Sequence, residues 1–262
     1  MQKTIQNSKK IVIKIGSSTI TSEDGTIDKE FIKNLAPQIK SLMDSGKRVI
    51  LVSSGARIAG VSTIGKWSRK EDINYKQALC AIGQVELMDS YRKIFGEYGL
   101  HIAQVLLTKE DFESTSRTLN IRNTLFTLLD EGVVPIINEN DTVCVEEIKI
   151  GDNDLMAART SELWGGDLLI ILSDIVGIYD KSPTENKDAK LIEIVNDPYD
   201  LEKNISIGKN SSFGTGGIAT KIKAAKIVTP YGTSLIVARG KQKNIILDLS
   251  EGKEKGTLFL GK

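Results

Sequence analysis

Two lysines lie where they could hold a phosphate group. Lys14 precedes a turn at Gly16, and Lys221 follows the run Gly214-Thr215-Gly216-Gly217-Ile218-Ala219-Thr220. Glycine-rich loops leave backbone N–H groups free to approach phosphate oxygens. A lysine in the first turn of a helix opposes the helix dipole by roughly 0.3–1 kcal/mol, which a bound polyphosphate would offset. Taken alone, Lys14 is better explained as a solvated lysine at a strand end, whereas Lys221 favours phosphate binding.

Small polar residues follow two apolar segments. Ser53-Ser54-Gly55-Ala56 could form an anion pocket at a helix start, or Ser54 could simply cap that helix. Asn138-Glu139-Asn140-Asp141 could form a polar cup for a substrate amine or carboxylate, or an Asx turn. Four polar groups are costly to bury without partners, which favours a binding role.

Two further acidic segments could contact a ligand. Gly151-Asp152-Asn153-Asp154 opens a helical pattern. One of its three polar residues would be enough to cap the helix, so the other two could orient lysines or a metal ion. Ser173-Asp174 follows the most apolar run of the chain, where a nucleotide base or ribose would lie. A plain turn is the alternative for the second segment.

The elements that must position these residues alternate between strand and helix. Periodicity predicts strands at 11–15, 49–52, 101–107, 133–137 and 168–172, and helices at 27–42, 74–98, 117–131 and 154–164, with a further helix that the glycine-rich run leads into and Pro230 ends. This alternation predicts a mostly parallel sheet covered on both faces. Ligands of such sheets bind beyond the carboxyl ends of the strands. A hairpin arm at 143–150 and a loop at 180–190, a candidate lid, complete the prediction.

Composition excludes several other classes of protein. The net charge of +1 and the aromatic content of 5% argue against a nucleic-acid partner. No run approaches the ~20 apolar residues of a membrane span, and the polar N-terminus is unlike a secretory signal. Two cysteines, Cys80 and Cys144, do not suggest disulfides or zinc, so we expect a cytoplasmic protein. P-loop and Rossmann fingerprints are absent, and His101 is expected to be structural, within an apolar strand.

Six short motifs, taken together and in this order, resemble those of the amino-acid kinase family, and the resemblance extends from Lys9 to Phe259. The motifs are Lys-x-Gly-Ser-Ser, Ser-Ser-Gly-Ala, Asn-Glu-Asn-Asp, Gly-Asp-Asn-Asp, Ser-Asp and Gly-Thr-Gly-Gly-x-x-Thr-Lys. The resemblance implies an α/β fold: an αβα sandwich around a mostly parallel open sheet. It implies one domain, 1–262, with a substrate-binding lobe at about 1–165 and a nucleotide-binding lobe at about 166–262. Ser173 replaces the family's usual threonine. Many relatives carry an additional C-terminal domain of RNA-modification type, which we do not expect here because little sequence follows Phe259.

The resemblance also implies a role for each motif. The implied catalytic residues are Lys14, Lys221, Asp152 and Asp154, with either aspartate orienting the lysines. The implied ATP-binding residues are Lys14, Gly16, Ser173, Asp174 and Thr215, Gly216, Gly217, Ile218, Ala219, Thr220, Lys221. The implied substrate-binding residues are Ser54, Gly55, Asn138, Asp141 and Asn153. Mg²⁺ would be held chiefly by the ATP phosphates, with no assigned protein ligand.

Within the family, the Asn-Glu-Asn-Asp and Gly-Asp-Asn-Asp pair is similar to that of members that phosphorylate the γ-carboxylate of L-glutamate, the first step of proline biosynthesis. The implied partners are L-glutamate and ATP, with L-proline as feedback inhibitor and a homodimer or homotetramer as the assembly. Neither nucleic acid nor membrane is expected. The alternatives are a family activity on aspartate, acetylglutamate, carbamate or UMP, and a non-catalytic nucleotide or amino-acid sensor.

Overall fold

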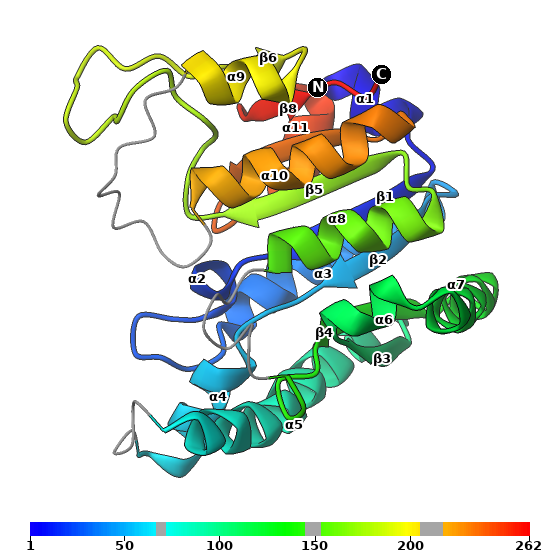
Figure 1. The fold of residues 1–262 in the computed structure, drawn as a ribbon. Helices are drawn as coiled ribbons and strands as arrows, with labels where there is room; N and C mark the ends of the chain where they lie inside the picture. The colour runs from blue at the N-terminus through cyan, green and yellow to red at the C-terminus, as the bar shows by residue number, and fades with distance from the viewer. Residues whose placement is uncertain (67–71, 145–152, 205–216) are drawn as a thin grey trace.

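A computed structural model describes residues 1–66, 72–144, 153–204 and 217–262 of the chain (Figure 1). Three of the predicted site residues, Asp152, Thr215 and Gly216, lie outside the described residues. Most of the predicted hairpin arm, 145–150, lies outside them as well.

The described residues form an eight-stranded sheet in the order β3-β4-β2-β1-β5-β7-β8-β6. Adjacent strands from β3 to β7 are parallel, β8 runs antiparallel to β7, and β6 is parallel to β8. The strands are β1 (Lys10–Ile15), β2 (Arg48–Val52), β3 (Ile102–Leu107), β4 (Val134–Glu139), β5 (Leu168–Ser173), β6 (Ile194–Val195), β7 (Ser234–Arg239) and β8 (Thr257–Phe259). The predicted mostly parallel sheet is confirmed.

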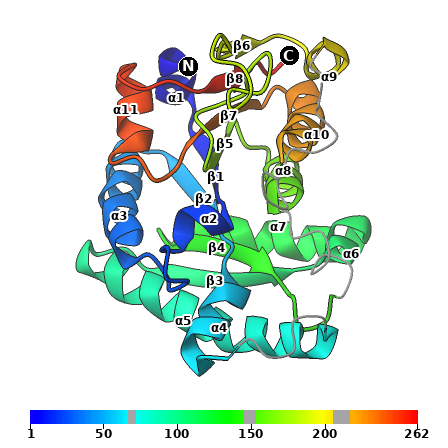
Figure 2. The same ribbon diagram turned by 90° about the vertical axis from the view of Figure 1, so that its left-hand side faces the viewer.

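Helices cover both faces of this sheet. Figure 2 shows α3 and α11 on one side of the strands and α8 and α10 on the other. The helices are α1 (Gln2–Asn7), α2 (Ser17–Ile20), α3 (Lys29–Asp44), α4 (Ala56–Ile64), α5 (Ile73–Glu97), α6 (Lys109–Glu113), α7 (Thr115–Asp130), α8 (Asn153–Trp164), α9 (Pro198–Asn204), α10 (Ile218–Val228) and α11 (Ile245–Glu251), with a 3₁₀ turn at Thr229–Tyr231. The αβα sandwich is therefore confirmed.

The alternation of side chains along β1 divides the core in two. Ile11, Ile13 and Ile15 pack against α3, α5 and α11, whereas Val12 faces the layer that contains α8 and α10. Because successive strand residues point to opposite faces, Lys14 shares the face of Val12. The period of the strand therefore directs the lysine toward α8 and α10.

Several sequence predictions need correction in detail. The strand predicted to end at Ile137 continues through Asn138 to Glu139, and both polar residues are buried. Helix α4 begins after Gly55, whose φ of 91° places it in the left-handed region, so Ser54 is not the cap. His101 is exposed and lies just before β3, not within an apolar strand. Among the described helices, none has both the length and the apolar character needed to cross a membrane.

Candidate active site

Lys14 lies at the centre of the sheet, near the carboxyl end of β1. Its register partners are Val52 of β2 and Ile171 of β5, so parallel strands flank it on both sides. Only 8% of its side chain is exposed. The predicted alternative, a solvated lysine at a strand end, is wrong, because the sheet and α8 enclose this side chain.

Asp154 joins Lys14 to Lys221 across the layer above the sheet. Its Oδ1 lies 2.6 Å from the Nζ of Lys14, and its Oδ2 lies 3.1 Å from the Nζ of Lys221. The aspartate side chain is fully buried, and 3% of that of Lys221 is exposed. Thr220 donates from its hydroxyl to the same Oδ2 at 3.0 Å. Three segments far apart in sequence thus meet at one carboxylate, which we call the lysine cluster: Lys14, Asp154, Thr220 and Lys221.

The charges of this cluster fix the ionisation of Asp154. Burial alone would raise the pKa of Asp154, but the ammonium groups of Lys14 and Lys221 outweigh burial and lower it from 3.8 to about 2. The carboxylate is therefore ionised at neutral pH. It holds two ammonium groups side by side, an arrangement suited to a ligand with oxyanion groups.

The turn after β1 leaves space beside the lysine cluster. The N–H of Gly16 donates to the carbonyl of Leu172 at 3.0 Å, which ties the turn to β5. A Cβ added at residue 16 would lie 3.3 Å from that carbonyl oxygen and 3.9 Å from the Nζ of Lys14. Glycine at this position therefore keeps the approach to Lys14 open.

Helix α10 begins beside the same cluster. Gly217 is its N-cap and supplies no side-chain cap, and Ile218 and Ala219 of the first turn are partly exposed. The hydroxyl of Thr220 also contacts the carbonyl of Gly217, at 2.8 Å. First-turn N–H groups of a helix commonly bind anions. The predicted position of Lys221 in this turn is confirmed.

Ser173 and Asp174 lie at the carboxyl end of β5, beside β1. Ser173 is buried, and its hydroxyl donates to the carboxylate of Asp174 at 2.9 Å. Its carbonyl accepts from the N–H of Gly240 at 2.7 Å. Asp174 itself is exposed, so its carboxylate is accessible at the same edge of the sheet as Lys14.

A second group of buried side chains joins the ends of β2, β4 and α8. The Nδ2 of Asn153 donates to the carbonyl of Ser53, to the hydroxyl of Ser54 at 3.2 Å and to the Oδ1 of Asn138 at 2.9 Å. The Nδ2 of Asn138 in turn donates to the Oε1 of Gln84 on α5 at 2.8 Å. We call Ser54, Gln84, Asn138 and Asn153 the amide cluster. Three of the five predicted substrate residues thus meet, and Gly55 adjoins them in sequence.

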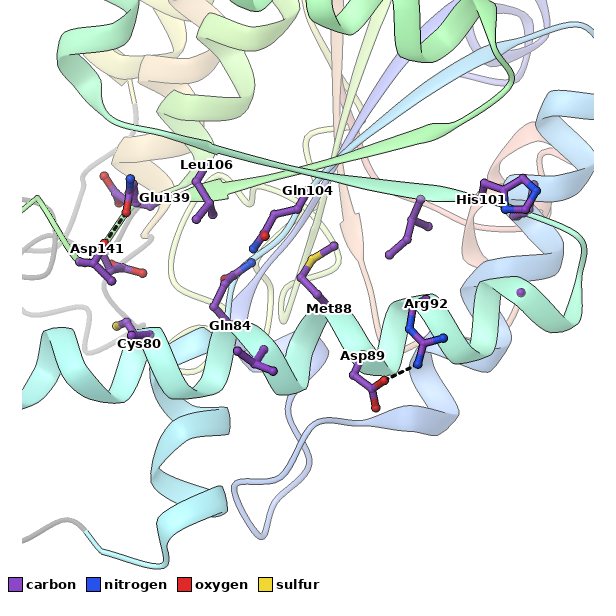
Figure 3. Close-up of a pocket in the computed structure, with 17 residues that line it drawn as sticks. Cys80, Gln84, Met88, Asp89, Arg92, His101, Gln104, Leu106, Glu139 and Asp141 are labelled. Carbon is purple, nitrogen blue, oxygen red and sulfur yellow. Dashed lines mark hydrogen bonds and ion pairs between the residues drawn. The ribbon is translucent and has the colours of Figure 1, made fainter.

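The described contacts of Asp141 do not include a residue of the amide cluster. Asp141 accepts a hydrogen bond from the thiol of Cys80 on α5 and lies near Arg57 on α4. Burial raises the pKa of Asp141 from 3.8, and the interactions with Cys80 and Arg57 offset part of that rise. With residues of α5 and β3 it lines a groove of about 1010 Å³ (Figure 3).

Sequence reasoning missed Gln84, and also Tyr91, whose hydroxyl lies 3.1 Å from that of Ser53. Both lie on α5, for which the sequence pattern predicts only an apolar stripe. Cys80, Gln84, Leu87 and Tyr91 recur at helical spacing and are all buried. A glutamine within such a stripe was the available signal, because buried amides need hydrogen-bond partners.

Comparison with known proteins places this arrangement in a family. The chain matches the amino acid kinase family over residues 9–238. It is 62% identical over 259 residues to a glutamate 5-kinase of Alkaliphilus metalliredigens, covering 99% of this chain and 98% of that protein. It is 48% identical over 251 residues to a glutamate 5-kinase of Caldanaerobacter subterraneus subsp. tengcongensis, covering 96% of this chain but 68% of that longer protein.

Solved structures agree with the fold. The crystal structure of UMP kinase from Ureaplasma parvum superposes with a TM-score of 0.68 at 19% identity, covering 97% of this chain and 99% of that one. An identity this low supports the fold alone, whereas the family match spans most of the sequence. The chain therefore belongs to the amino acid kinase family.

Proposed function

We propose that this protein transfers the γ-phosphoryl group of ATP to the γ-carboxylate of L-glutamate, giving L-glutamyl 5-phosphate for proline biosynthesis. The observation that carries the proposal is the lysine cluster, in which Asp154 holds Lys14 and Lys221 at the carboxyl end of the central strands. The high identity to proteins named glutamate 5-kinase supports glutamate as the acceptor.

The chemistry needs charge stabilisation more than proton transfer. The acceptor carboxylate and the γ-phosphate are both anions, and two unit charges 4 Å apart repel by ~4 kcal/mol at an effective dielectric constant of about 20. Lys14 and Lys221 would offset this repulsion and stabilise charge on the transferring group. A glutamate carboxylate, with a pKa of about 4.3, is already ionised at neutral pH and needs no general base.

We place ATP on the side of α10 and β5. The first turn of α10, from Gly217 to Lys221, would bind the phosphates through its N–H groups, and Ser173 and Asp174 would contact the nucleoside. Asp154 already serves two lysines, and the described residues contain no group of three or more His, Cys, Asp or Glu side chains suited to a metal ion. A Mg²⁺ ion would enter with ATP and be held chiefly by the phosphate oxygens.

We place glutamate on the side of the amide cluster. Because the hydroxyl of Ser54 accepts from Asn153, its hydrogen can be donated to a substrate carboxylate. Asn138 and Asn153 would set the position of Ser54, and Gly55 forms the left-handed turn from which α4 begins. The carboxylate of Asp141 is suited to the α-ammonium group of the substrate.

Other parts of the proposal rest on family resemblance alone. These are the two lobes divided near residue 165, a homodimer or homotetramer, feedback inhibition by L-proline and a cytoplasmic location.

The decisive experiment traps the acyl phosphate with hydroxylamine while ADP release is followed. The acceptor panel is glutamate, aspartate, acetylglutamate, carbamate and UMP. We expect hydroxamate formation with glutamate at a kcat/KM well above that for the other carboxylates. Turnover with a different acceptor would assign another family activity. Binding of ATP and glutamate without ADP release or hydroxamate would identify a non-catalytic sensor.

A further inference from the structure

The donors and acceptors of the amide cluster follow a fixed order, which a backbone carbonyl determines. The carbonyl oxygen of Ser53 can only accept, so Asn153 must turn its Nδ2 toward it. The same Nδ2 contacts Asn138, which must therefore present its Oδ1 at 2.9 Å. This leaves the Nδ2 of Asn138 directed at α5, where it needs an acceptor.

Gln84 supplies that acceptor. Its Oε1 lies 2.8 Å from the Nδ2 of Asn138, and 9% of the glutamine is exposed. The opposite orientation of Gln84 would set two NH₂ groups against each other at this distance. The other end of its amide, Nε2, has no hydrogen-bond partner among the described residues. The contact with Asn138 therefore decides which way the Gln84 amide faces.

One face of helix α5 thus contacts both the amide cluster and the neighbouring Ser53. Tyr91 contacts the hydroxyl of Ser53 at 3.1 Å, and Gln84 contacts Asn138. Ser53 and Asn138 lie at the carboxyl ends of neighbouring parallel strands, β2 and β4, where the proposed substrate would bind. A change at Gln84 would reach Ser54 through Asn138 and Asn153, without any contact between the glutamine and the substrate.

We propose that Gln84 is a positioning residue for substrate recognition: it accepts the hydrogen bond that Asn138 directs at α5, and so holds Asn138 and, through Asn153, the hydroxyl of Ser54 in place. This inference rests on the proposed function, because it concerns the affinity for glutamate. Gln84 has no described contact with the lysine cluster. A substitution of Gln84 should therefore change the KM for glutamate and not the rate of phosphoryl transfer.

The test compares Gln84→Met with Gln104→Met in the hydroxylamine assay. Gln104 on β3 lines the same groove, opposite Gln84 in Figure 3, and is exposed, so it is a matched glutamine outside the cluster. Removing an acceptor from a buried donor predicts a rise of about tenfold or more in the KM for glutamate with Gln84→Met. The kcat and the KM for ATP should stay within about threefold of wild type, and Gln104→Met should change none of the three.

Gln84→Glu keeps an acceptor toward Asn138 and should recover most of the affinity that Gln84→Met loses. If Gln84→Met does not fold, Gln84→Ala against Gln104→Ala makes the same comparison. A KM for glutamate that stays at the wild-type value in an active variant overturns the inference and leaves the proposed function standing. A uniform loss of kcat with a lower melting temperature and no KM change assigns Gln84 a merely structural role. A wild-type protein without glutamate-dependent hydroxamate formation overturns both proposals.

Discussion

The lysine cluster and the amide cluster hold their side chains by different physical means. In the lysine cluster, Asp154 attracts two ammonium groups, at 2.6 and 3.1 Å. In the amide cluster, neutral groups are linked in one direction, from the Nδ2 of Asn153 through Asn138 to Gln84. Most side chains of both clusters are buried, yet one cluster depends on charge and the other on the placement of hydrogen atoms.

This difference suggests a division of labour within the site. Coulomb attraction falls slowly with distance, so charged groups can follow a phosphoryl group as it moves from donor to acceptor. A hydrogen bond weakens steeply when its angle or length changes, so directed amides discriminate between substrates of different shape. We therefore expect changes in the lysine cluster to act mainly on kcat and changes in the amide cluster mainly on the KM for glutamate.

The largest effect is expected from Lys221→Ala, which removes one of the two ammonium groups. Loss of a preorganised electrostatic group typically lowers kcat by about 10²–10³-fold, and loss of a full charge should lie at or above the upper end. Lys223→Ala, on the exposed side of the same helix, is the matched control and should keep its kcat. Near-normal turnover of Lys221→Ala in a steady-state ADP-release assay would remove this lysine from the mechanism.

Asp154→Asn should cost stability as well as activity. Breaking a buried ion pair by removing one partner typically costs about 3–5 kcal/mol. Denaturant unfolding at neutral pH measures this loss. Glu162→Gln on the same helix removes a partly exposed pair with Arg159 and should cost less than about 1 kcal/mol. Equal losses for the two variants would contradict the central position of Asp154.

The same aspartate predicts how stability depends on pH. Because folding lowers the pKa of Asp154 from 3.8 to about 2, its contribution is present above about pH 4 and is lost as pH falls toward about 2. Unfolding measured between these values should show a steeper acid loss in the wild type than in Asp154→Asn. Parallel curves would show that the two lysines do not lower this pKa.

Asn153→Ala should distinguish the kinetic role of the amide cluster from that of the lysine cluster. It removes the donor shared by Ser53, Ser54 and Asn138, and leaving buried acceptors unpaired typically costs about 1–3 kcal/mol. We expect the KM for glutamate to rise about 10- to 100-fold, with a smaller change in kcat. The exposed Asn123 on α7 provides a control. A fall in kcat at unchanged KM would contradict the division of labour.

The smallest predicted effect concerns Asp141. If its carboxylate binds the α-ammonium group, Asp141→Ala raises the KM for glutamate. Because burial raises the pKa of Asp141 above 3.8, wild-type affinity should weaken as acidification protonates it, and this part of the pH dependence should be absent from Asp141→Asn. Kinetics of both proteins across the acidic range test this. Identical KM profiles would place Asp141 outside the substrate site.

The order of strands and helices could be predicted from the sequence because it follows from local periodicity. The spans predicted for β1, α3, α5 and α8 agree with the structure to within about two residues at their ends. The elements that escaped prediction include α1, the six-residue strand β7 and the short strands β6 and β8. The two or three residues of β6 and β8 carry too little periodicity to be distinguished from a loop, whereas the apolar run Leu235-Ile236-Val237 of β7 was a signal that the prediction did not use.

The types and approximate places of the candidate site residues were likewise available from the sequence, since glycines, amides and acids follow apolar strands at the edge where ligands of parallel sheets bind. Only the tertiary structure decided which of them meet. Asp154 is 140 residues from Lys14 and 67 from Lys221, and no local pattern encodes a contact over such a separation. The packing of α8 and α10 on the same face of β1 brings the three together, and that packing depends on the whole sheet. The role inferred for Gln84 has the same origin, because only the position of α5 beside β4 turns a helical glutamine into a partner of Asn138.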